Sequence, residues 1–198
     1  MTRKFVYSIA LGVFVCTTAM TIASLVTPNW VTYSVRADNT GARFTKSVGL
    51  HQTCSNVALP NCRPFPSEDD CRDDREFCSL WRTSNFLLSF ATIFELATLV
   101  TFGVVLAGGK YKREGGWKLI GGFLLADAAV EFVSMGIVSY LFENDMQFIV
   151  PGWRLDFSYY LCTVSASVSV LLAVGLAASA IFLPPEDDYE SLEDPLDS

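Results

Sequence analysis

The stretch Gly49-Leu50-His51-Gln52-Thr53-Cys54, followed by Cys62, Cys71 and Cys78, connects the first two long apolar segments of the chain. Four cysteines in one connecting segment predict two disulfides, and disulfides persist in an oxidising compartment. We therefore expect this segment on the luminal or extracellular side of a membrane. The four cysteines allow three pairings, and we favour the two sequence-local ones, Cys54–Cys62 and Cys71–Cys78.

Apolar residues are concentrated in four segments of the chain, which has 198 residues and is 51% hydrophobic. A helix of about 20 apolar residues crosses a bilayer, and a helix satisfies its own backbone hydrogen bonds in lipid. We expect four transmembrane helices at residues 5–26, 86–107, 119–142 and 159–183. The first segment is longer than the apolar core of a cleaved signal peptide, so we expect it to be retained.

Basic residues near the spans predict the orientation, because such residues remain on the cytoplasmic side. They lie before the first span and between the second and third: Arg3, Lys4, Lys110, Lys112, Arg113 and Lys118. Both termini are therefore expected in the cytoplasm, with outer loops at 27–85 and 143–158 and an inner loop at 108–118. The tail at 184–198 carries seven of the 21 acidic residues and no basic ones, so we expect it to be disordered.

The first outer loop is long enough for a small antiparallel sheet. Residues 30–35 are rich in β-branched and aromatic side chains, as strands are, and Asp38-Asn39-Thr40-Gly41 is a turn signal. Residues 44–50 then form the returning strand of a hairpin, and Pro60-Asn61 suggests a second tight turn. The expected fold class is an all-α membrane protein, a four-transmembrane-helix bundle with a small disulfide-stapled antiparallel β-sheet in the first extracellular loop.

Trp30, followed by Gly49-Leu50-x-x-x-Cys54 and then Cys62, resembles the claudin signature Trp … Gly-Leu-Trp-x-x-Cys … Cys. Arg82 is similar to a basic residue that claudins carry just before the second span. The claudin and peripheral myelin protein superfamily of four-span membrane proteins also includes lens membrane proteins and channel γ-subunits, and fungal plasma-membrane tetraspans follow a similar plan.

This resemblance implies a plasma-membrane protein that acts in cell–cell contact, barrier or membrane-domain organisation through its outer loop. Its partners would be the bilayer, other membrane proteins or copies of itself. The alternative function implied by the resemblance is an auxiliary, γ-type subunit of a channel, receptor or membrane enzyme.

Three features depart from the family pattern. His51 stands where the family usually has Trp, and we expect it to pack in place of that Trp. The second cysteine pair, Cys71 and Cys78, is absent from most claudins. The C-terminus Pro195-Leu196-Asp197-Ser198 lacks the hydrophobic last residue of a claudin-type PDZ ligand, so a PDZ scaffold is not an expected partner. The chain is therefore claudin-like rather than a typical tight-junction claudin.

Three acidic residues fall inside the predicted spans: Glu95, Asp127 and Glu131. An ionised carboxylate at mid-span costs about 2.5–3.5 kcal/mol on insertion scales, so each one needs a reason. Asp127 and Glu131 share a helix face, and Glu95 and Glu131 reach a similar depth, so they can meet. One interpretation is a buried cation or proton site, or a docking point for a basic residue of a partner helix. We favour the other, protonated carboxyls whose hydrogen bonds hold the helices together.

Small residues recur every four positions in the fourth span, at Ser165, Ser169, Ala173 and Ala177. Such a stripe lets helix backbones approach closely. We expect it to pack inside the bundle rather than to mark an oligomer interface.

The sequence contains no motif typical of an enzyme: no His/Asp/Ser constellation, no phosphate loop and no set of metal ligands. A zinc site at the cysteines is disfavoured because the chain has one histidine and no paired C-x-x-C spacing. We therefore expect no enzyme activity, cofactor or metal, and the lack of a basic groove excludes nucleic acid as a partner. In the tail, Tyr189-Glu190-Ser191-Leu192 fits a Tyr-x-x-hydrophobic sorting signal, with Tyr189 and Leu192 as its key residues.

Overall fold

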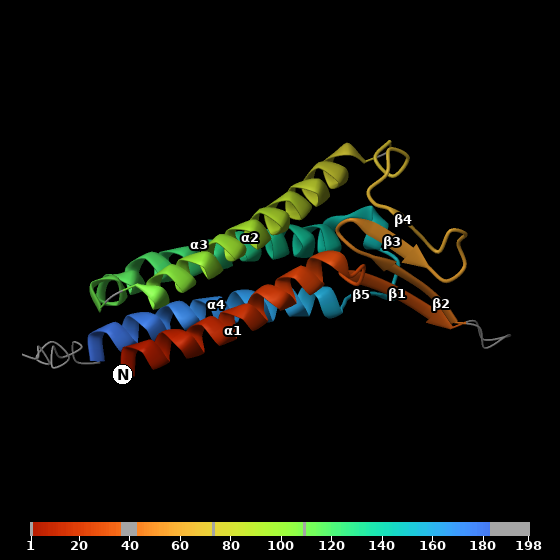
Figure 1. Ribbon diagram of the computed structural model, residues 1–198. Coiled ribbons are helices and arrows are strands. Elements are labelled where there is room, and N and C mark those ends of the chain that lie inside the picture. Colours follow the sequence, from red (N-terminus) through yellow and green to blue (C-terminus); the bar gives the residue numbers. More distant parts are fainter. Residues whose placement is uncertain (1, 37–42, 73, 109, 183–198) are drawn as a thin grey trace, which may run out of the picture.

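Four long helices lie side by side, and a β-sheet covers one end of them (Figure 1). The computed structural model describes residues 2–36, 43–72, 74–108 and 110–182. The helices are α1 (Thr2–Val26), α2 (Arg75–Ala107), α3 (Lys110–Asn144) and α4 (Phe157–Phe182). Each contains a stretch long and apolar enough to cross a membrane, which confirms the four expected apolar helices.

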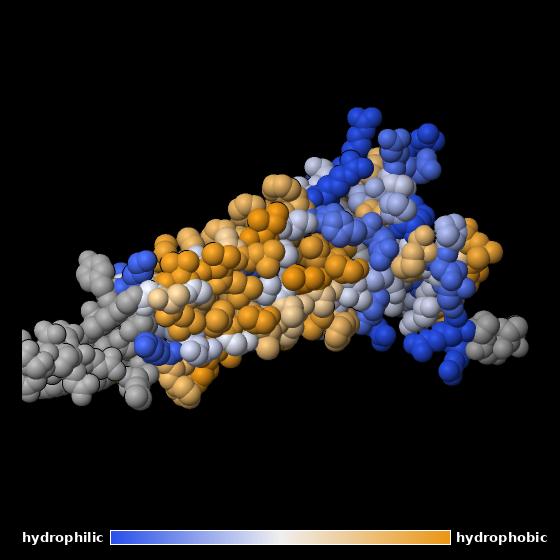
Figure 2. Space-filling view, in the orientation of Figure 1, coloured by the Kyte–Doolittle hydropathy of each residue, from blue (hydrophilic) through white to orange (hydrophobic). Residues whose placement is uncertain are grey.

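The bundle is closed, because α1 packs against α2 and α4, and α3 packs against the same two helices. Apolar side chains cover the outer faces of the helices, whereas hydrophilic ones gather around the sheet and at the opposite tip (Figure 2). We call these two ends the sheet end and the far end. Side chains exposed on the helix faces include Ile93, Val100 and Leu171. An apolar surface of this extent suits contact with lipid tails rather than water.

Two helices extend beyond the expected spans, into the segments expected to connect them at 27–85 and 108–118. Residues 75–85 are helical because Asp74 caps α2 by accepting a hydrogen bond from the Phe77 N–H at 2.9 Å. At the far end α2 stops at Gly108, and α3 already begins at Lys110. Hydropathy detects only the lipid-length part of a helix, so polar helical ends are assigned to loops.

The sheet has five antiparallel strands in the order β4-β3-β2-β1-β5. Their bounds are β1 Val31–Arg36, β2 Arg43–Val48, β3 Gln52–Ser55, β4 Cys62–Pro64 and β5 Trp153–Leu155. The expected hairpin is confirmed, with Val31 opposite Val48, although its turn at 38–41 lies outside the described residues. The chain also returns at Pro60-Asn61, which places Cys54 opposite Cys62.

The fifth strand was not expected, because it comes from the second connecting segment, at 143–158. That segment forms a short 3-10 turn, η1 (Met146–Phe148), and then β5, which pairs with the free edge of β1. Gly152 precedes β5 with φ +120°, a conformation that favours glycine, and a Cβ there would lie 2.9 Å from the Tyr33 ring. The sheet therefore joins both connecting segments at the sheet end.

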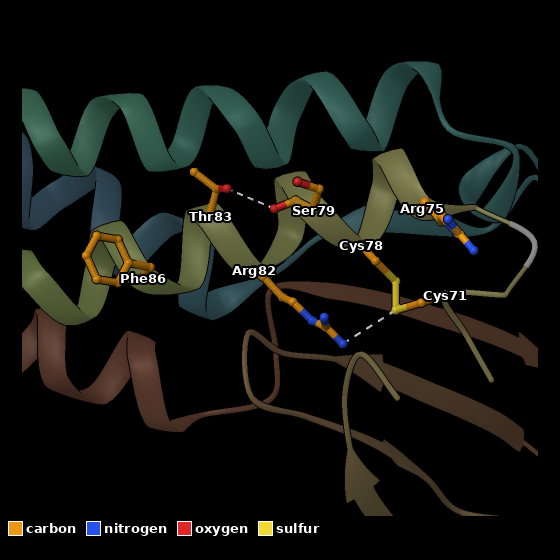
Figure 3. A pocket seen from close by; sticks show the side chains of 7 residues that line it. All are labelled: Cys71, Arg75, Cys78, Ser79, Arg82, Thr83 and Phe86. Atoms are coloured by element: carbon orange, nitrogen blue, oxygen red, sulfur yellow. Dashed lines mark hydrogen bonds between the residues drawn. A yellow bond between two sulfur atoms is a disulfide. The ribbon is translucent and has the colours of Figure 1, made fainter. Parts of the chain in front are cut away.

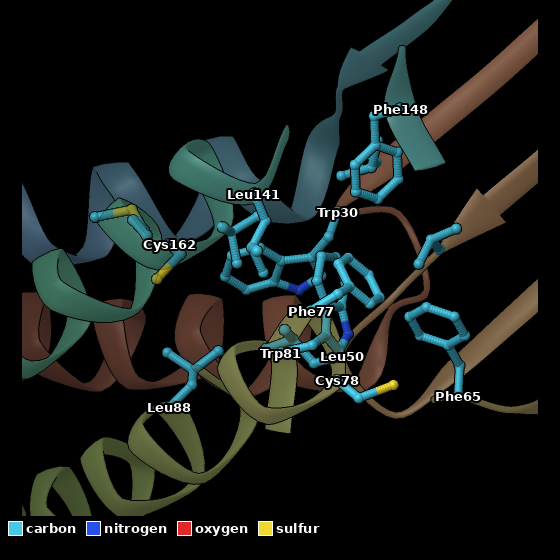
Figure 4. Close-up of a cluster of buried hydrophobic side chains, with 14 of the residues drawn as sticks. Trp30, Leu50, Phe65, Phe77, Cys78, Trp81, Leu88, Leu141, Phe148 and Cys162 are labelled. Carbon is cyan, nitrogen blue, oxygen red and sulfur yellow. The ribbon is translucent and has the colours of Figure 1, made fainter. Parts of the chain in front are cut away.

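Two separate hydrophobic clusters fill the interior. The sheet-end cluster runs from the helices into the sheet and includes Trp30, Leu50, Phe77, Trp81 and Phe148 (Figure 4). The far-end cluster includes Tyr7, Phe14, Phe102, Ile120 and Leu124. Between the two clusters most of the buried side chains are polar, apart from Ala91 and Ala128, so the bundle has a polar layer at mid-length.

Candidate functional site

The motif residues Trp30, Gly49 and Leu50 join the sheet to the helices. Trp30 and Leu50 are fully buried, and the Trp30 indole N–H donates to the Ser24 carbonyl of α1 at 2.7 Å. Gly49 lies so close to the backbone of Pro28 that an added Cβ would be 2.5 Å from the Pro28 Cα. The Gly49 carbonyl accepts a hydrogen bond from the Trp81 indole N–H of α2 at 3.2 Å. The motif is thus a brace between the sheet and the first two helices.

Both favoured disulfides are confirmed. Cys54–Cys62 joins β3 to β4, and Cys71–Cys78 joins the segment before α2 to the first turn of that helix. The remaining described cysteines, Cys16 and Cys162, are free. Each covalent link closes a short loop, so the sheet edge and the start of α2 are both held in place.

An ion pair further fixes the segment between the two disulfides. The Arg63 guanidinium donates to both carboxylate oxygens of Asp70, at 2.7 and 2.8 Å, and the Ser67 hydroxyl donates to Asp70 at 2.6 Å. The hydrogen bond from Arg63 lowers the pKa of Asp70, although desolvation opposes the shift. The charge on Asp70 is therefore paired in an ordered contact rather than only solvated.

Arg82, the last motif residue, lines an open pocket beside the second disulfide (Figure 3). The pocket has a volume of about 470 Å³, and its walls include Arg75, Ser79, Thr83 and Phe86. The Arg82 guanidinium points toward the Cys71 sulfur, 3.8 Å away (Figure 3). Two guanidinium groups and two hydroxyls above an exposed phenyl ring are a combination that suits an anion.

His51 does not pack in place of the family Trp, and that expectation is corrected. Its side chain is exposed, and its Nδ1 lies 3.1 Å from the Asn85 side-chain nitrogen. The buried aromatic ring near this segment comes from α2, where Trp81 packs against Phe65 and Phe77. A polar residue at position 51 is tolerated because that side chain faces outward.

Exposed apolar side chains lie on two loops of the sheet end. Val57 and Leu59 lie in the β3–β4 turn, and Leu59 is 94% exposed. Ile149 and Val150 lie in the loop between η1 and β5 and are also exposed. Apolar residues on exposed loops beside a hydrophilic sheet are typical of a contact surface.

The three acidic residues meet in the polar layer. Glu95 comes from α2, and Asp127 and Glu131 come from α3. One carboxylate oxygen from each lies within 4.8 Å of the others, and the three residues are 0%, 1% and 0% exposed. The prediction that Glu95 and Glu131 meet is confirmed. A set of three buried carboxylates can hold a metal ion or protons.

Two hydroxyls complete the cluster, and the sequence did not single out the first of them. The Thr21 hydroxyl of α1 lies 3.0 Å from a Glu95 oxygen and 2.8 Å from a Glu131 oxygen. The Ser165 hydroxyl of α4 lies 2.7 Å from that of Thr21. The signal for Thr21 is a polar stripe within an apolar span, Thr17, Thr18, Thr21 and Ser24, at helical spacing. All four helices therefore contribute to the cluster.

Several polar atoms of the layer have no hydrogen-bond partner. They are Glu95 Oε2, both carboxylate oxygens of Asp127, Glu131 Oε2 and the Ser169 hydroxyl. Buried polar atoms are nearly always paired. Hydrogen bonds from hydroxyls therefore account for only part of the layer, and a hydrogen bond between the Glu95 and Asp127 side chains accounts for a further part when one of them is protonated.

The possible sorting signal, Tyr189 and Leu192, lies outside the described residues. Comparison with known proteins finds no family model that matches the chain and no curated protein that is significantly similar to it.

Proposed function

We propose that this chain is a claudin-like multi-pass protein of the plasma membrane, acting in cell–cell contact, barrier or membrane-domain organisation. The observation that carries the proposal is a stapled sheet, braced against the helices by buried tryptophans, at one end of four apolar helices. A rigid sheet presents its loops in a defined orientation, as a contact surface requires. The chain acts without catalysis, and its partners are other membrane proteins or further copies of itself.

The sheet lies on the outer side of the plasma membrane, and both termini lie in the cytoplasm. Two observations support this orientation. The sheet end carries both disulfides, one within the sheet and one at the start of α2, and disulfides require an oxidising compartment. The start of α3, at the far end, carries the basic residues Lys110, Lys112, Arg113 and Lys118, and such residues remain in the cytoplasm.

The contact surface is formed by the two apolar loops of the sheet end. Val57 and Leu59 lie at one edge of the sheet, beyond β3 and β4, whereas Ile149 and Val150 precede β5 at the other edge. A partner on a facing membrane, or a neighbour in the same membrane, buries these side chains on binding. The surrounding polar strands set the orientation of the complex.

The auxiliary-subunit function has less support from this geometry. If a basic residue of a partner's membrane helix docked on the acidic residues, those side chains would have to be reachable from outside the bundle. Glu95, Asp127 and Glu131 are all enclosed by the four helices. A helix that docks on the lipid-facing surface does not contact them.

A mixed-cell experiment tests the proposal. Two cell populations express the chain with different fluorescent tags, and the fluorescence at contacts between two expressing cells is compared with contacts to non-expressing cells. We expect enrichment at contacts between expressing cells, and at least a twofold loss when Val57→Ser and Leu59→Ser are combined. The exposed outer-loop variant Glu68→Gln is the matched control and keeps the enrichment.

Two results would overturn the contact function. One is an even distribution over the membrane together with co-purification of a larger membrane protein in equal amount, which supports the auxiliary subunit. The other is enrichment that is unchanged when both apolar side chains are replaced, which removes the proposed surface.

A further inference from the structure

We propose that the polar layer of the bundle is a binding site for a hard divalent cation of about the size of Ca²⁺. The ligands are the carboxylates of Glu95, Asp127 and Glu131, supported by the hydroxyls of Thr21, Ser165 and Ser169. This site is separate from the contact surface at the sheet end. Its existence does not depend on the proposed function.

The charge of the layer needs a positive partner that the bundle does not supply. Three carboxyl groups lie together, and none of the buried side chains among the described residues is basic. An uncompensated carboxylate away from water is strongly destabilising. The compensating charge must therefore come from bound protons or from a bound metal ion.

The Thr21 hydroxyl has a single hydrogen, so it cannot donate a full hydrogen bond to two ionised glutamates. The Thr21 oxygen lies within 3.2 Å of the Thr17 carbonyl oxygen and of one oxygen each from Glu95 and Glu131. All three neighbours can only accept when the carboxylates are ionised, but a hydroxyl carries one hydrogen. At least one close oxygen pair would then have no proton between its atoms. Either a proton or a cation at the cluster removes this conflict.

Asp127 is the least satisfied of the three acids. It is 1% exposed, and its carboxylate oxygens accept no hydrogen bond from a hydroxyl or an N–H group. A proton shared between Glu95 and Asp127 satisfies one pair of oxygens, whereas a metal ion also coordinates the oxygens that remain free. Glu95 and Glu131 also keep one unpartnered oxygen each.

A second, independent polar group lies at the level of Asp127. Ser165 and Glu131 both lie close to Thr21, so they share one level of the bundle. Ser169 is one turn further from the sheet on α4, and Asp127 is one turn further from the sheet on α3. Ser169 is fully buried, and its hydroxyl has no hydrogen-bond partner. Unpartnered oxygens from two helices that pack together therefore lie at the same level along the bundle.

The spacing of the carboxylates suits one ion. Three oxygens within 4.8 Å of one another lie within about 2.8 Å of a common point, so a small inward movement brings them into the range of about 2.3–2.6 Å for Ca²⁺–oxygen bonds. Mg²⁺ needs shorter bonds of about 2.0–2.1 Å and usually keeps several waters, and apolar clusters close this layer on both sides. An all-oxygen ligand set disfavours zinc and copper, which prefer nitrogen and sulfur. A divalent ion cancels two of the three charges, and one proton on the third carboxyl makes the site neutral.

Such an ion would link all four helices through their mid-length side chains. The contributing side chains are Thr21 from α1, Glu95 from α2, Asp127 and Glu131 from α3, and Ser165 from α4. Since the layer separates two apolar clusters, the ion also fixes how the two halves of the bundle meet. Removing the ion is expected to lower the thermal stability of the whole bundle.

Equilibrium binding of radioactive Ca²⁺ to the full-length chain tests the site. The chain is purified in detergent micelles, stripped with EDTA and titrated at physiological ionic strength, with Mn²⁺ and Mg²⁺ as competitors. We expect one saturable Ca²⁺ per chain, displaced better by Mn²⁺ than by Mg²⁺, together with a rise in melting temperature. Asp127→Asn lowers the affinity at least tenfold. Glu143→Gln, an exposed acid on the same helix, and Glu68→Gln in the outer loop leave it unchanged.

Three results would overturn the proposal, and the first two need no variant. One is the absence of saturable binding to the wild-type chain up to about 1 mM. Another is a wild-type stability that follows pH but is the same in EDTA and in Ca²⁺, which indicates protons only. The third is equal affinity in the wild type and in a folded Asp127→Asn or Ser169→Ala chain, which places the ion elsewhere.

Discussion

Replacing Trp81 with alanine tests whether the contacts between the sheet and the helices stabilise the fold. Trp81 is fully buried, and its ring centroid lies 5.6 Å from that of Phe65, 5.4 Å from that of Phe77 and 6.2 Å from that of Phe148. Its indole N–H also donates to the Gly49 carbonyl between β2 and β3. The variant therefore loses contacts to both connecting segments and to the sheet.

The expected loss of unfolding free energy is about 4–5 kcal/mol. A buried Trp→Ala change costs about 3–5 kcal/mol, and the unpaired Gly49 carbonyl adds to the upper part of that range. Phe86→Ala is the matched control on the same helix. Phe86 is 68% exposed, and among the aromatic rings of the described residues it stacks on Phe90 alone. The control should cost less than about 1 kcal/mol.

The assay is denaturant unfolding of the purified chain in mixed micelles, followed by far-ultraviolet circular dichroism. Circular dichroism avoids the loss of tryptophan fluorescence in the variant. A loss below about 1 kcal/mol for Trp81→Ala, or equal losses for the two variants, would refute the brace between sheet and helices.

Two further variants test the motif glycine and the ordered ion pair. Gly49→Ala places a Cβ 2.5 Å from the Pro28 Cα, and because the backbone must move we expect the free energy of unfolding to fall by about 1–3 kcal/mol. Denaturant unfolding by the same assay checks this, and an unchanged stability would contradict it. Arg63 lowers the pKa of Asp70, so this pair stabilises the fold at neutral pH, and the contribution is lost progressively as pH falls from about 4 through the lowered pKa of Asp70. Arg63→Gln should therefore remove less than about 1 kcal/mol at pH 7, since the pair is partly exposed, and progressively less as pH falls below about 4. A loss that does not decrease over this range would contradict the prediction.

Hydropathy located the four helices but not their polar ends. Residues 75–85 are helical because of the Asp74 cap and the burial of Phe77 and Trp81, and neither feature raises the mean hydropathy of a window. The three residues of β5 are too few to form a recognisable alternation. Their conformation depends on the free edge of β1, which comes from a distant part of the chain.

Counting residues along the predicted helices was sufficient to predict that Glu95 and Glu131 lie at a similar depth and meet. The same counting did not identify Thr21 and Ser165 as their neighbours, because it does not say which faces of α1 and α4 turn inward. The stripe containing Ser165 and Ser169 was assigned to close packing, and the burial of both residues agrees with that prediction. Their free or shared hydroxyls add a polar role that only the assembled bundle reveals.

Thiol labelling in intact cells tests most directly the central claim that the stapled sheet faces the outside of the cell. Leu59→Cys places a thiol on the exposed β3–β4 turn, and Lys112→Cys places one at the far end, where the side chain is also exposed. A membrane-impermeant maleimide should label Leu59→Cys in intact cells and Lys112→Cys only after permeabilisation. The reverse pattern, or equal labelling of both before permeabilisation, would contradict the proposed topology and the contact function built on it.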